Sequence, residues 1–374
     1  MRIAFGIVSL FPGGGLQRDC LAIAKSIRNS CDELIVYTSR LADGIQSDDI
    51  TIVPLPNGAM SNHQRQYRFA LEFASKVAGK FDLVVAFDKI LGADVLFCAD
   101  ASILYRMQKN RLLYLLPRYR TFADLEGGSF RSDRKTKIIL LSQDQLNKYR
   151  IAWQTQPGRL FLVPPTIAAS RRKPELRSNG TRQTLRSQLG LAQDAWAWIA
   201  VGVQPRTKGL DRAIRALEYF PDAHLLVVGL DETAKSSAKL LNSAYYRRVS
   251  PRITWLGHRE DIAPLLSAAD LFVHPARYDT TGAVILEALV NGVPVITTSA
   301  CGYATHVDAA QAGVVVKEPF EFGIFLAALN EAREDNRHTA WSMSGINYGQ
   351  HASLYEGRTR AAEIILSVAQ EKGR

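Results

Sequence analysis

Short runs of nearly continuous apolar residues alternate along this chain with longer segments in which apolar positions recur every three or four residues. The short runs predict parallel strands covered on both faces, and the longer segments predict helices between them. In the first half, the expected strands are Ile3–Ser9, Leu34–Thr38, Thr51–Val53, Leu83–Ala86, Val95–Phe97, Ile138–Leu141 and Phe161–Val163, and the expected helices include Gln17–Ile27 and Gln64–Val77.

The pattern is interrupted at Pro164–Asn179, which reads PPTIAASRRKPELRSN and predicts a linker, because it is rich in Pro, Ser and charge. It then restarts. The expected strands are Trp198–Val203, Leu225–Val228, Ile253–Leu256, Leu271–His274, Val293–Thr297 and Gly313–Val316, and the expected helices are Gly209–Tyr219, Thr233–Arg247, Ile262–Ala268, Gly282–Asn291 and a last one at Glu356–Gln370.

Strand–helix alternation of this kind predicts an α/β fold with doubly wound parallel sheets. We expect two Rossmann-like domains, at 1–165 and 166–351, with a C-terminal helix at about 352–374 that packs back on the first. Two such halves would face each other across a cleft at the carboxyl ends of their strands, where open α/β sheets bind ligands.

The charge of the chain is concentrated in two places. The formal net charge is +10; residues 103–137 hold nine Lys or Arg and three acids, and residues 168–190 hold six Lys or Arg and one acid. Such clusters favour an anionic partner, whether phosphate, a membrane surface or nucleic acid, although a solvated basic face remains an equal alternative. No apolar run reaches the roughly 20 residues of a membrane span, and the N-terminus lacks a signal-peptide pattern, so a cytoplasmic protein is expected.

A glycine-rich loop follows the first expected strand. The segment Pro12–Asp19 reads PGGGLQRD and leads directly into a helix. Glycines permit a close backbone approach, and a helix start offers free N–H groups to an anion or a sugar. A structural tight turn is the alternative, because the segment is neither G-x-G-x-x-G nor a P-loop.

A second loop of this kind, Gly202–Gly209, reads GVQPRTKG at another strand end. Arg206 and Lys208 are candidates to contact a diphosphate, Lys as a point charge and Arg as a fork of donors. A solvated helix start is the alternative.

The most specific string is Ser267–Ala288, SAADLFVHPARYDTTGAVILEA. It predicts a strand, a loop with Asp279, and a helix that opens near Gly282 and Ala283 and carries Glu287 about one and a half turns in. Two carboxylates would flank a helix N-terminus that favours phosphate, so one is suited to sugar hydroxyls and the other to ribose hydroxyls.

Sequence motifs for several other kinds of active site are absent. The chain has no D-x-D, no H-E-x-x-H and no G-x-S-x-G, and its four cysteines are scattered. We therefore expect neither a metal nor another cofactor, and a leaving diphosphate would be neutralised by Arg, Lys and helix dipoles.

Two further features stand in the first half. Asp100 follows a strand-like run, where a carboxylate either faces the ligand edge and contacts an acceptor hydroxyl or caps the next helix. The stretch Leu104–Phe130 interleaves Tyr, Leu and Phe with Arg and Lys, which suits an anionic membrane surface. No nucleic-acid-binding motif accompanies it, so nucleic acid is not expected as a partner.

Taken together, FPGGGLQRD, Phe97–Asp100, the basic aromatic stretch, VPP at 163–165, the ADLFVHPARYDTTGAVILEA block and the CGYATH loop resemble, in the same order, the retaining glycosyltransferases of GT-B fold with an E-x7-E motif. The chain is most similar to the lipopolysaccharide core glucosyltransferases among them, over essentially its whole length. The resemblance implies a UDP-sugar donor, usually UDP-glucose, a heptose of the inner core as acceptor, and retention without metal.

The resemblance also implies roles for individual residues. Gly14, Gly15 and Asp19 would line the sugar and acceptor side, and Asp100 would face the acceptor. The expected catalytic residues are Asp100, Asp279 and Lys208. The expected donor contacts are Gly14, Gly15, Asp19, Arg171, Arg206, Lys208, Arg259, Asp279, Gly282, Ala283 and Glu287, with Asp279 on the hexose and Glu287 on the ribose. The 103–137 region would contact the inner face of the inner membrane. Its candidate membrane residues are Arg106, Lys109, Arg111, Tyr114, Arg118, Tyr119 and Arg120.

Two positions depart from the family pattern. The first acid of E-x7-E is Asp279, one methylene shorter, and the family's Arg–Lys pair is Thr207–Lys208, with Arg206 as a possible substitute. Three other functions stay open: a GT-B-like nucleotide-sugar epimerase, a non-catalytic membrane-binding module that keeps only the fold, and, more weakly, a Rossmann dehydrogenase.

Overall fold

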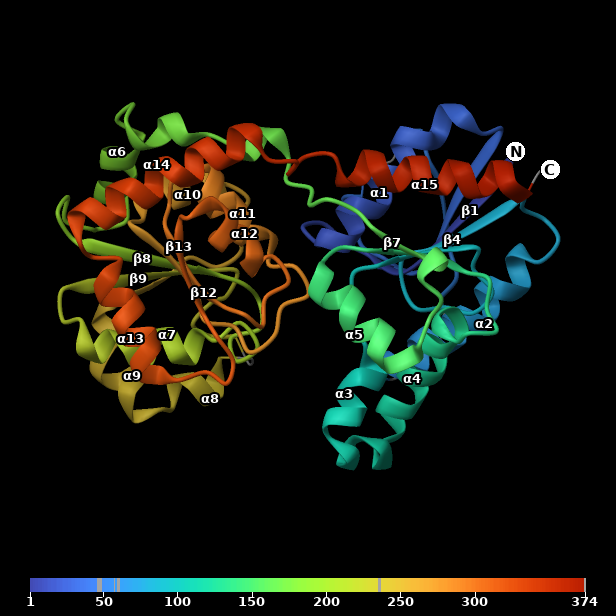
Figure 1. The fold of residues 1–374 in the computed structure, drawn as a ribbon, viewed down its shortest axis with the longest axis horizontal. Coiled ribbons are helices and arrows are strands. Elements are labelled where there is room, and N and C mark those ends of the chain that lie inside the picture. Colours follow the sequence, from blue (N-terminus) through green and yellow to red (C-terminus); the bar gives the residue numbers. More distant parts are fainter. Residues whose placement is uncertain (46–48, 57, 59–60, 235–236, 373–374) are drawn as a thin grey trace. The chain divides into compact units, whose positions relative to one another are not determined.

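A computed structural model describes residues 1–45, 49–56, 58, 61–234 and 237–372. The chain divides into two compact units, Met1–Pro165 with Glu356–Arg374 and Thr166–Tyr355 (Figure 1). Each unit is a parallel sheet with helices on both faces, so the prediction of doubly wound α/β architecture is confirmed.

The sheet of unit 1 has seven strands in the order β3-β2-β1-β4-β5-β6-β7, and all its paired strands are parallel. The strands are β1 (Arg2–Leu10), β2 (Glu33–Leu41), β3 (Thr51–Pro54), β4 (Leu83–Ala86), β5 (Val95–Cys98), β6 (Lys137–Leu140) and β7 (Leu160–Leu162).

Alternate residues of β1 show how both faces are buried. Ile3, Phe5 and Ile7 pack with apolar residues of α1 (Gly15–Ile27) and of the C-terminal α15 (Gly357–Lys372) (Figure 1). Ala4 packs on the opposite face with residues of α2 (Asn62–Val77), α4 (Pro117–Phe130) and α5 (Gln143–Trp153). The strand is therefore apolar throughout, as parallel strands with two covered faces are.

Unit 1 also carries a helical hairpin between β5 and β6. It consists of α3 (Ile103–Lys109), a 3₁₀ turn η2 (Arg111–Leu115) and α4. The far ends of α3 and α4 project beyond the rest of the unit (Figure 1). The basic aromatic stretch of the sequence thus forms one projecting element, named the basic hairpin below.

The sheet of unit 2 has six strands in the order β10-β9-β8-β11-β12-β13, again with parallel pairings. The strands are β8 (Trp196–Val201), β9 (Ala223–Val228), β10 (Ile253–Trp255), β11 (Leu271–His274), β12 (Val295–Thr298) and β13 (Gly313–Val316).

Helices cover both faces of this sheet (Figure 1). They are α6 (Thr181–Gln188), α7 (Leu210–Ala216), α8 (Ala238–Leu241), α9 (Ala244–Val249), α10 (Ile262–Ala268), α11 (Ala283–Val290), α12 (Ala304–Ala310), α13 (Phe322–Glu331) and α14 (Asp335–His351). Ala197 and Ile199 of β8 pack on one face, and Trp196 and Trp198 pack on the other.

Two local predictions were wrong, the continuous helix at Thr233–Arg247 and the linker, and one of the two alternatives for Asp100 is excluded. The helix expected at Thr233–Arg247 is divided into α8 and α9, because Ser243 starts a new helix by accepting a hydrogen bond from the Tyr246 amide; Lys235 and Ser236 lie outside the described residues. Asp100 does not cap the next helix, since Ser102 does. The expected linker is mostly packed on unit 2, as the next paragraph describes.

The segment after Pro165 is an ordered part of unit 2. It forms two 3₁₀ turns, η4 (Ala169–Arg171) and η5 (Pro174–Arg177), and the side chain of Ile167 is only 3% exposed. Arg177 donates from Nη1 to the Ala269 carbonyl at 2.9 Å. The composition of this segment, rich in Pro and charge, suggested an exposed linker. Its buried surface comes instead from one Ile and from the apolar stems of Arg side chains.

Candidate functional site

The strand order of unit 2 fixes where its ligand edge lies. β8 is flanked by β9 on one side and β11 on the other. The order in which successive strands are added to the sheet therefore reverses at β8, although all the strands are parallel. In open parallel sheets, the loops that leave such neighbouring strands diverge and form the ligand site. Loops 202–209 and 275–282 leave β8 and β11, and they touch where the Arg277 amide donates to the Thr207 carbonyl at 2.8 Å.

Two glycines shape the loop after β8. Gly202 and Gly209 have φ angles of 155° and 75°. A Cβ at Gly209 would lie 1.9 Å from the carbonyl oxygen of Pro275, so only glycine permits this approach to the end of β11. The Lys208 amide closes the loop by donating to the Gln204 carbonyl at 2.9 Å. The loop therefore presents Lys208 to the segment that follows β11.

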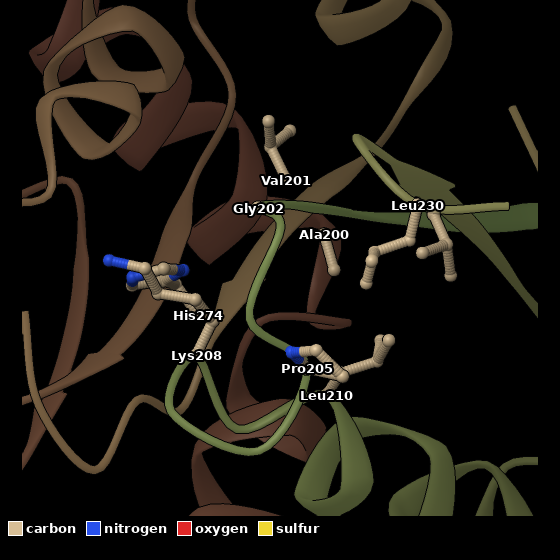
Figure 2. Close-up of a pocket in the computed structure, with 9 residues that line it drawn as sticks. Ala200, Val201, Gly202, Pro205, Lys208, Leu210, Leu230 and His274 are labelled. Carbon is tan, nitrogen blue, oxygen red and sulfur yellow. The ribbon is translucent and has the colours of Figure 1, made fainter. Parts of the chain in front are cut away.

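Lys208, His274 and Asp279 meet at one carboxylate oxygen. Nζ of Lys208 lies 2.7 Å and Nε2 of His274 lies 2.9 Å from Oδ2 of Asp279. His274 is 3% exposed and Asp279 is 8% exposed. Figure 2 shows Lys208 and His274 close together at the wall of a small pocket. Its other lining residues are Ala200, Val201, Gly202, Pro205, Leu210, Val227 and Leu230.

This contact shifts both pKa values. Burial alone would lower the pKa of His274, but hydrogen bonds with Asp279 and Cys301 outweigh it and raise the value to about 9. Burial alone would raise the pKa of Asp279, but the hydrogen bond from His274 and the charge of Lys208 lower it to about 2. At neutral pH His274 is therefore protonated and Asp279 is ionised.

Backbone hydrogen bonds fasten the Asp279 loop to the loop after β12. The Asp279 amide donates to the Ala300 carbonyl at 3.1 Å, and the Asp279 carbonyl accepts from the Gly302 amide at 3.0 Å. The Tyr303 amide donates to the Thr281 carbonyl at 2.8 Å. The CGYATH loop thus holds the position of the Asp279 backbone.

A second ion pair lies at Glu287 on α11. Nη1 of Arg171 is 2.9 and 3.1 Å from the two carboxylate oxygens of Glu287, whose side chain is 6% exposed. Asn291, one turn further along the helix, donates to the carbonyls of Arg171 at 2.8 Å and Glu287 at 2.7 Å. Its oxygen accepts from the Lys173 amide at 2.7 Å. Asn291 therefore anchors the segment that places Arg171 over Glu287.

The start of α11 lies beside the first carboxylate. Gly282 precedes the helix with a φ of 78°, and a Cβ there would lie 3.5 Å from Oδ2 of Asp279. Helix N-termini present backbone donors and a partial positive charge to anions. The arrangement suits a ligand that carries both phosphates and hydroxyls: the cations can turn to phosphate oxygens, and the carboxylates can accept from hydroxyl groups.

Two other basic residues predicted for the donor also lie on unit 2, Arg206 on the same loop as Lys208 and Arg259 after β10. Arg206 is exposed, and its carbonyl accepts a hydrogen bond from Nη1 of Arg277 at 2.7 Å. Arg277 is also bound by the Asp211 carboxylate at 2.7 Å. Arg259 follows β10, and its guanidinium pairs with Asp261.

The residues predicted in unit 1 take three separate places. Gly14 is the residue before α1, Gly15 is its first residue, and no atom lies within 4 Å of a Cβ built at Gly15. Asp19 pairs with Nε of Arg358 on α15 at 2.8 Å. Asp100 follows β5 with its side chain exposed.

The seven candidate membrane residues all lie on the basic hairpin. Six are exposed, and Tyr119 is half-buried. The guanidinium of Arg106 lies 5.6 Å from the ring centre of Tyr119. Exposed leucines stand among them at the hairpin's far end, with Leu112 at 71% and Leu115 at 69% exposure.

Sequence reasoning left three residues of these sites without a role. His274 was expected only as the end of a strand, and the signal for its role is its position five residues before Asp279. Asn291 and Arg358 carry no local signal, because their partners are Arg171, 120 residues away, and Asp19, 339 residues away.

Neither a metal cluster nor a membrane-spanning helix is found among the residues that the structure describes. No group of three or more His, Cys, Asp or Glu side chains comes together there in a way that could hold a metal ion. Within the same residues, every helix falls short of the length and apolar character needed to cross a membrane.

Comparison with known proteins gives the same picture over the whole chain. Residues 181–344 match the family model described as "Glycosyl transferases group 1". The chain is 32% identical to lipopolysaccharide glucosyltransferase WaaG of Escherichia coli K12, over 98% of each chain. The crystal structure of WaaG, a glycosyltransferase involved in lipopolysaccharide biosynthesis, has a TM-score of 0.87 at 30% identity and covers 97% of this chain and 99% of WaaG.

A more distant structure supports the fold. Alr3699/HepE of Anabaena, solved in complex with UDP and glucose, has a TM-score of 0.75 at 21% identity over 98% of this chain and all of its own. The predicted family, GT-B fold and enzyme class are thereby confirmed. The chain belongs to the group 1 glycosyltransferases, and within that family it is a full-length relative of WaaG.

Proposed function

We propose that this enzyme is a retaining, metal-independent hexosyltransferase that moves a sugar, with glucose as the expected one, from a UDP-sugar to a heptose of the lipopolysaccharide inner core. The observation that carries the proposal is the pair of buried carboxylates at the ligand edge of unit 2, Asp279 paired with Lys208 and His274 and Glu287 paired with Arg171. The name of the E. coli relative, a lipopolysaccharide glucosyltransferase, supports the choice of sugar and acceptor.

The donor is assigned to unit 2. Lys208 and the start of α11, at Gly282 and Ala283, would bind the diphosphate, Asp279 would accept from hexose hydroxyls, and Glu287 from ribose hydroxyls. Arg171 would turn from Glu287 toward the donor. Arg206 and Arg259 are further proposed contacts; since Arg259 is paired with Asp261, its role requires that pair to open.

The acceptor is assigned to unit 1. Gly14 and Gly15 would approach the sugar with their backbone, and Asp19, held by Arg358, would support the start of α1 beside them. The exposed carboxylate of Asp100 would accept a hydrogen bond from a neighbouring hydroxyl of the acceptor and so orient the attacking one.

The transfer needs no nucleophile from the protein. The bond between the anomeric carbon and the β-phosphate oxygen breaks, and a bond from that carbon to the acceptor oxygen forms on the same face. The proton of the acceptor hydroxyl passes to the departing phosphate. Lys208 and the dipole of α11 would stabilise the negative charge that develops on the diphosphate, which is the task a metal performs in other enzymes.

Docking on the inner face of the inner membrane is assigned to the basic hairpin. Its exposed basic residues suit anionic headgroups, and Leu112, Leu115 and Leu116 are exposed beside them. Clustered Lys and Arg near a membrane contribute about 1 kcal/mol each, and buried apolar side chains add to this. The protein would then be cytoplasmic and peripheral to the membrane.

Thermal unfolding in the presence of chelator tests the donor assignment. The ligand panel is UDP, UDP-glucose, UDP-galactose, UDP-N-acetylglucosamine, GDP-mannose, ADP and NAD. A ligand at 100 times its Kd adds about 2.7 kcal/mol, which raises the Tm by several degrees. Stabilisation by UDP and one UDP-sugar supports the proposal. Stabilisation by none points to a binding module, and by NAD alone to a dehydrogenase; an epimerase would convert the UDP-sugar without acceptor.

A further inference from the structure

A buried ion pair joins the base of the basic hairpin to the rest of unit 1, apart from the residues assigned to donor and acceptor. Nζ of Lys89 is 2.7 Å from Oε2 of Glu126, and the two side chains are 4% and 0% exposed. The ammonium also donates to the Ala101 carbonyl at 2.6 Å. Two opposite charges are thus held out of water between β4, β5 and α4.

Glu126 also binds the start of α3. It accepts from the amides of Ile103 at 2.8 Å and Leu104 at 3.2 Å, and from the hydroxyl of Ser102 at 2.7 Å. The first amides of a helix have no partner within the helix, so a carboxylate on α4 satisfies them here. The indole of Trp153, at the end of α5, donates to the same carboxylate at 2.6 Å.

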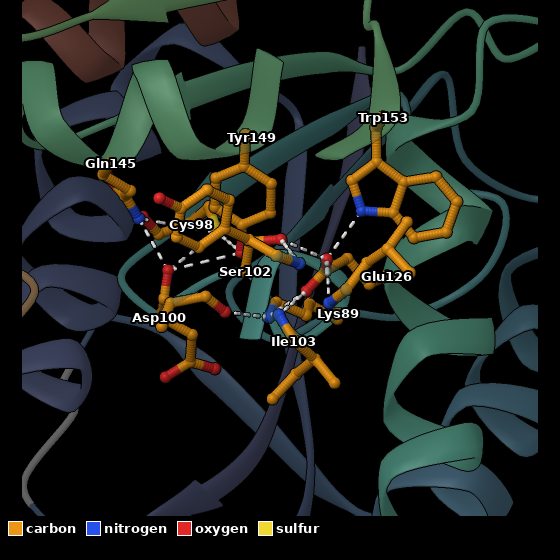
Figure 3. Close-up of polar contacts among 12 residues, drawn as sticks. Lys89, Cys98, Asp100, Ser102, Ile103, Glu126, Gln145, Tyr149 and Trp153 are labelled. Atoms are coloured by element: carbon orange, nitrogen blue, oxygen red, sulfur yellow. Dashed lines mark hydrogen bonds and ion pairs between the residues drawn. The ribbon is translucent and has the colours of Figure 1, made fainter. Parts of the chain in front are cut away.

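The segment held in this way carries Asp100. Nε2 of Gln145 donates to the carbonyls of Cys98 and Asp100, both at 2.8 Å, and the hydroxyl of Tyr149 lies 3.3 Å from the Asp100 carbonyl. Figure 3 shows the backbone of Asp100 inside this network and its carboxylate pointing away from it. The backbone around Asp100 is therefore fixed from both sides, while its side chain stays exposed.

The energetics of such a pair point to a role other than stability. Replacing a buried ion pair by apolar residues of similar size is often neutral or stabilising, whereas removing one partner is strongly destabilising. The charges of the Lys89–Glu126 pair are therefore weak evidence for a role in stability, and the hydrogen bonds of Glu126 with the start of α3 are a separate contribution. What the pair adds is a defined position for residues 100–104 relative to α4, the helix that carries Arg118 and Arg120.

We propose that Lys89 and Glu126 are positioning residues that couple the basic hairpin to Asp100, so that contact of the hairpin with an anionic surface makes local opening of the hydrogen-bonded Asp100 segment rarer and raises turnover. The surface acts on α3 and α4, Glu126 joins α4 to the start of α3, and Asp100 lies three residues before that helix. The proposal rests on the proposed function, its kinetic part on sugar transfer and its vesicle part on docking by the basic hairpin.

Hydrogen–deuterium exchange tests the coupling without any turnover. In the wild-type chain, vesicles containing anionic lipid should slow exchange at the amides of Ile103 and Leu104, and zwitterionic vesicles should not. Glu126→Gln should raise exchange at these amides at least tenfold and remove the vesicle effect. Asp133→Asn is the matched control, because it removes one exposed negative charge close to the hairpin base.

Kinetics separate positioning from folding. Glu126→Gln should lower kcat for transfer at least tenfold and leave the KM for the donor and the UDP-induced thermal shift unchanged. The double variant Lys89→Met/Glu126→Gln should keep the fold, since both charges are removed together and the amide keeps one acceptor oxygen for the start of α3, and should still show the low kcat. In an Asp100→Asn background, Glu126→Gln should have little further effect, because it acts through Asp100.

Three results would overturn the proposal. One is an amide exchange rate at Ile103 and Leu104 that is the same in Glu126→Gln as in the wild type. Another is a wild-type kcat in a folded double variant, and the last is an equal loss from Glu126→Gln with and without Asp100. If the wild-type chain transfers no sugar from any UDP-sugar, the proposed function fails, and the exchange experiment still decides whether hairpin and Asp100 segment are coupled.

Discussion

The ammonium of Lys208 lies 2.7 Å from the carboxylate of Asp279, so the cation proposed for the diphosphate and the carboxylate proposed for the hexose are each other's partners. When the donor binds, its phosphate would contact the ammonium and its sugar hydroxyls would contact the carboxylate. The single contact between Lys208 and Asp279 would thus be replaced by two contacts with the donor. Because both groups are already charged and in place, little reorganisation is needed, which favours preorganised stabilisation of charge.

Removal of the Lys208 charge tests this exchange. We expect Lys208→Met to weaken the binding of both UDP and UDP-glucose about ten- to hundredfold, since a hydrogen bond with a charged group is worth roughly 1.5–3 kcal/mol. Isothermal titration calorimetry measures both dissociation constants. Lys76→Met, at an exposed position of α2, is the control. An unchanged Kd for UDP would remove Lys208 from the diphosphate site.

Substitution of Glu287 and substitution of Asp279 should affect the binding of UDP and of UDP-glucose differently. Glu287→Gln should weaken UDP and UDP-glucose by the same factor, about tenfold, because both contain the ribose. Asp279→Asn should weaken UDP-glucose and change UDP much less, because only the sugar contacts Asp279 in the proposed complex. The same titrations give the ratio of variant to wild-type Kd for both ligands and both variants. Equal losses for both ligands in Asp279→Asn would contradict the hexose assignment.

The raised pKa of His274 predicts how stability depends on pH. Its pKa is about 9 in the folded chain and 6.5 when unperturbed. The imidazolium therefore contributes stability fully below pH 6.5, and this contribution is lost as the pH rises through 9, with a slope of up to about 1.4 kcal/mol per pH unit. Asp279, with a lowered pKa, contributes above pH 3.8 and loses this only as the pH falls through about 2.

The measurement is the free energy of unfolding of the wild type and of Asp279→Asn between pH 6.5 and 9.5. Asparagine cannot balance the imidazolium, and burial then lowers the pKa of His274, so the decline toward pH 9 should disappear in the variant. The ring proton shifts of His274 report the same titration directly. A wild-type decline that persists in Asp279→Asn would show that another group causes it.

The leucines at the tip of the basic hairpin predict a loss of membrane binding without a loss of folding. Leu112→Ser/Leu115→Ser should reduce sedimentation with anionic vesicles by tenfold or more. Both side chains are exposed, so the free energy of unfolding should change by no more than about 0.5 kcal/mol per site. Leu71→Ser on α2, 47% exposed, is a control outside the hairpin. Unchanged sedimentation would move the membrane contact elsewhere.

The sequence predicted those parts of the molecule that local patterns encode. Expected and observed strand limits agree within about three residues, because a buried parallel strand needs a continuous apolar run in its own sequence. The loop with Lys208 and the loop with Asp279 were both expected at strand ends, and the strand order brings them together.

Other features depend on partners far along the chain. Arg171 and Glu287 are 116 residues apart, and Lys89 and Glu126 belong to different elements of unit 1. Asp19 was expected on the sugar side, and its ion pair with Arg358 of the last helix had no signal in its neighbourhood. Such contacts follow from tertiary packing, so a single sequence read locally does not contain them.

The hydrogen bonds that join the Asp279 loop to the segment Ala300–Tyr303 have a consequence for engineering. The two loops exchange backbone bonds in both directions, so they form one rigid unit built from two separate stretches of sequence. Grafting only the segment 275–282 from another family member would leave these bonds mismatched and shift the carboxylate. Sugar preference should therefore transfer between family members only when both loops are exchanged together, as a single cassette.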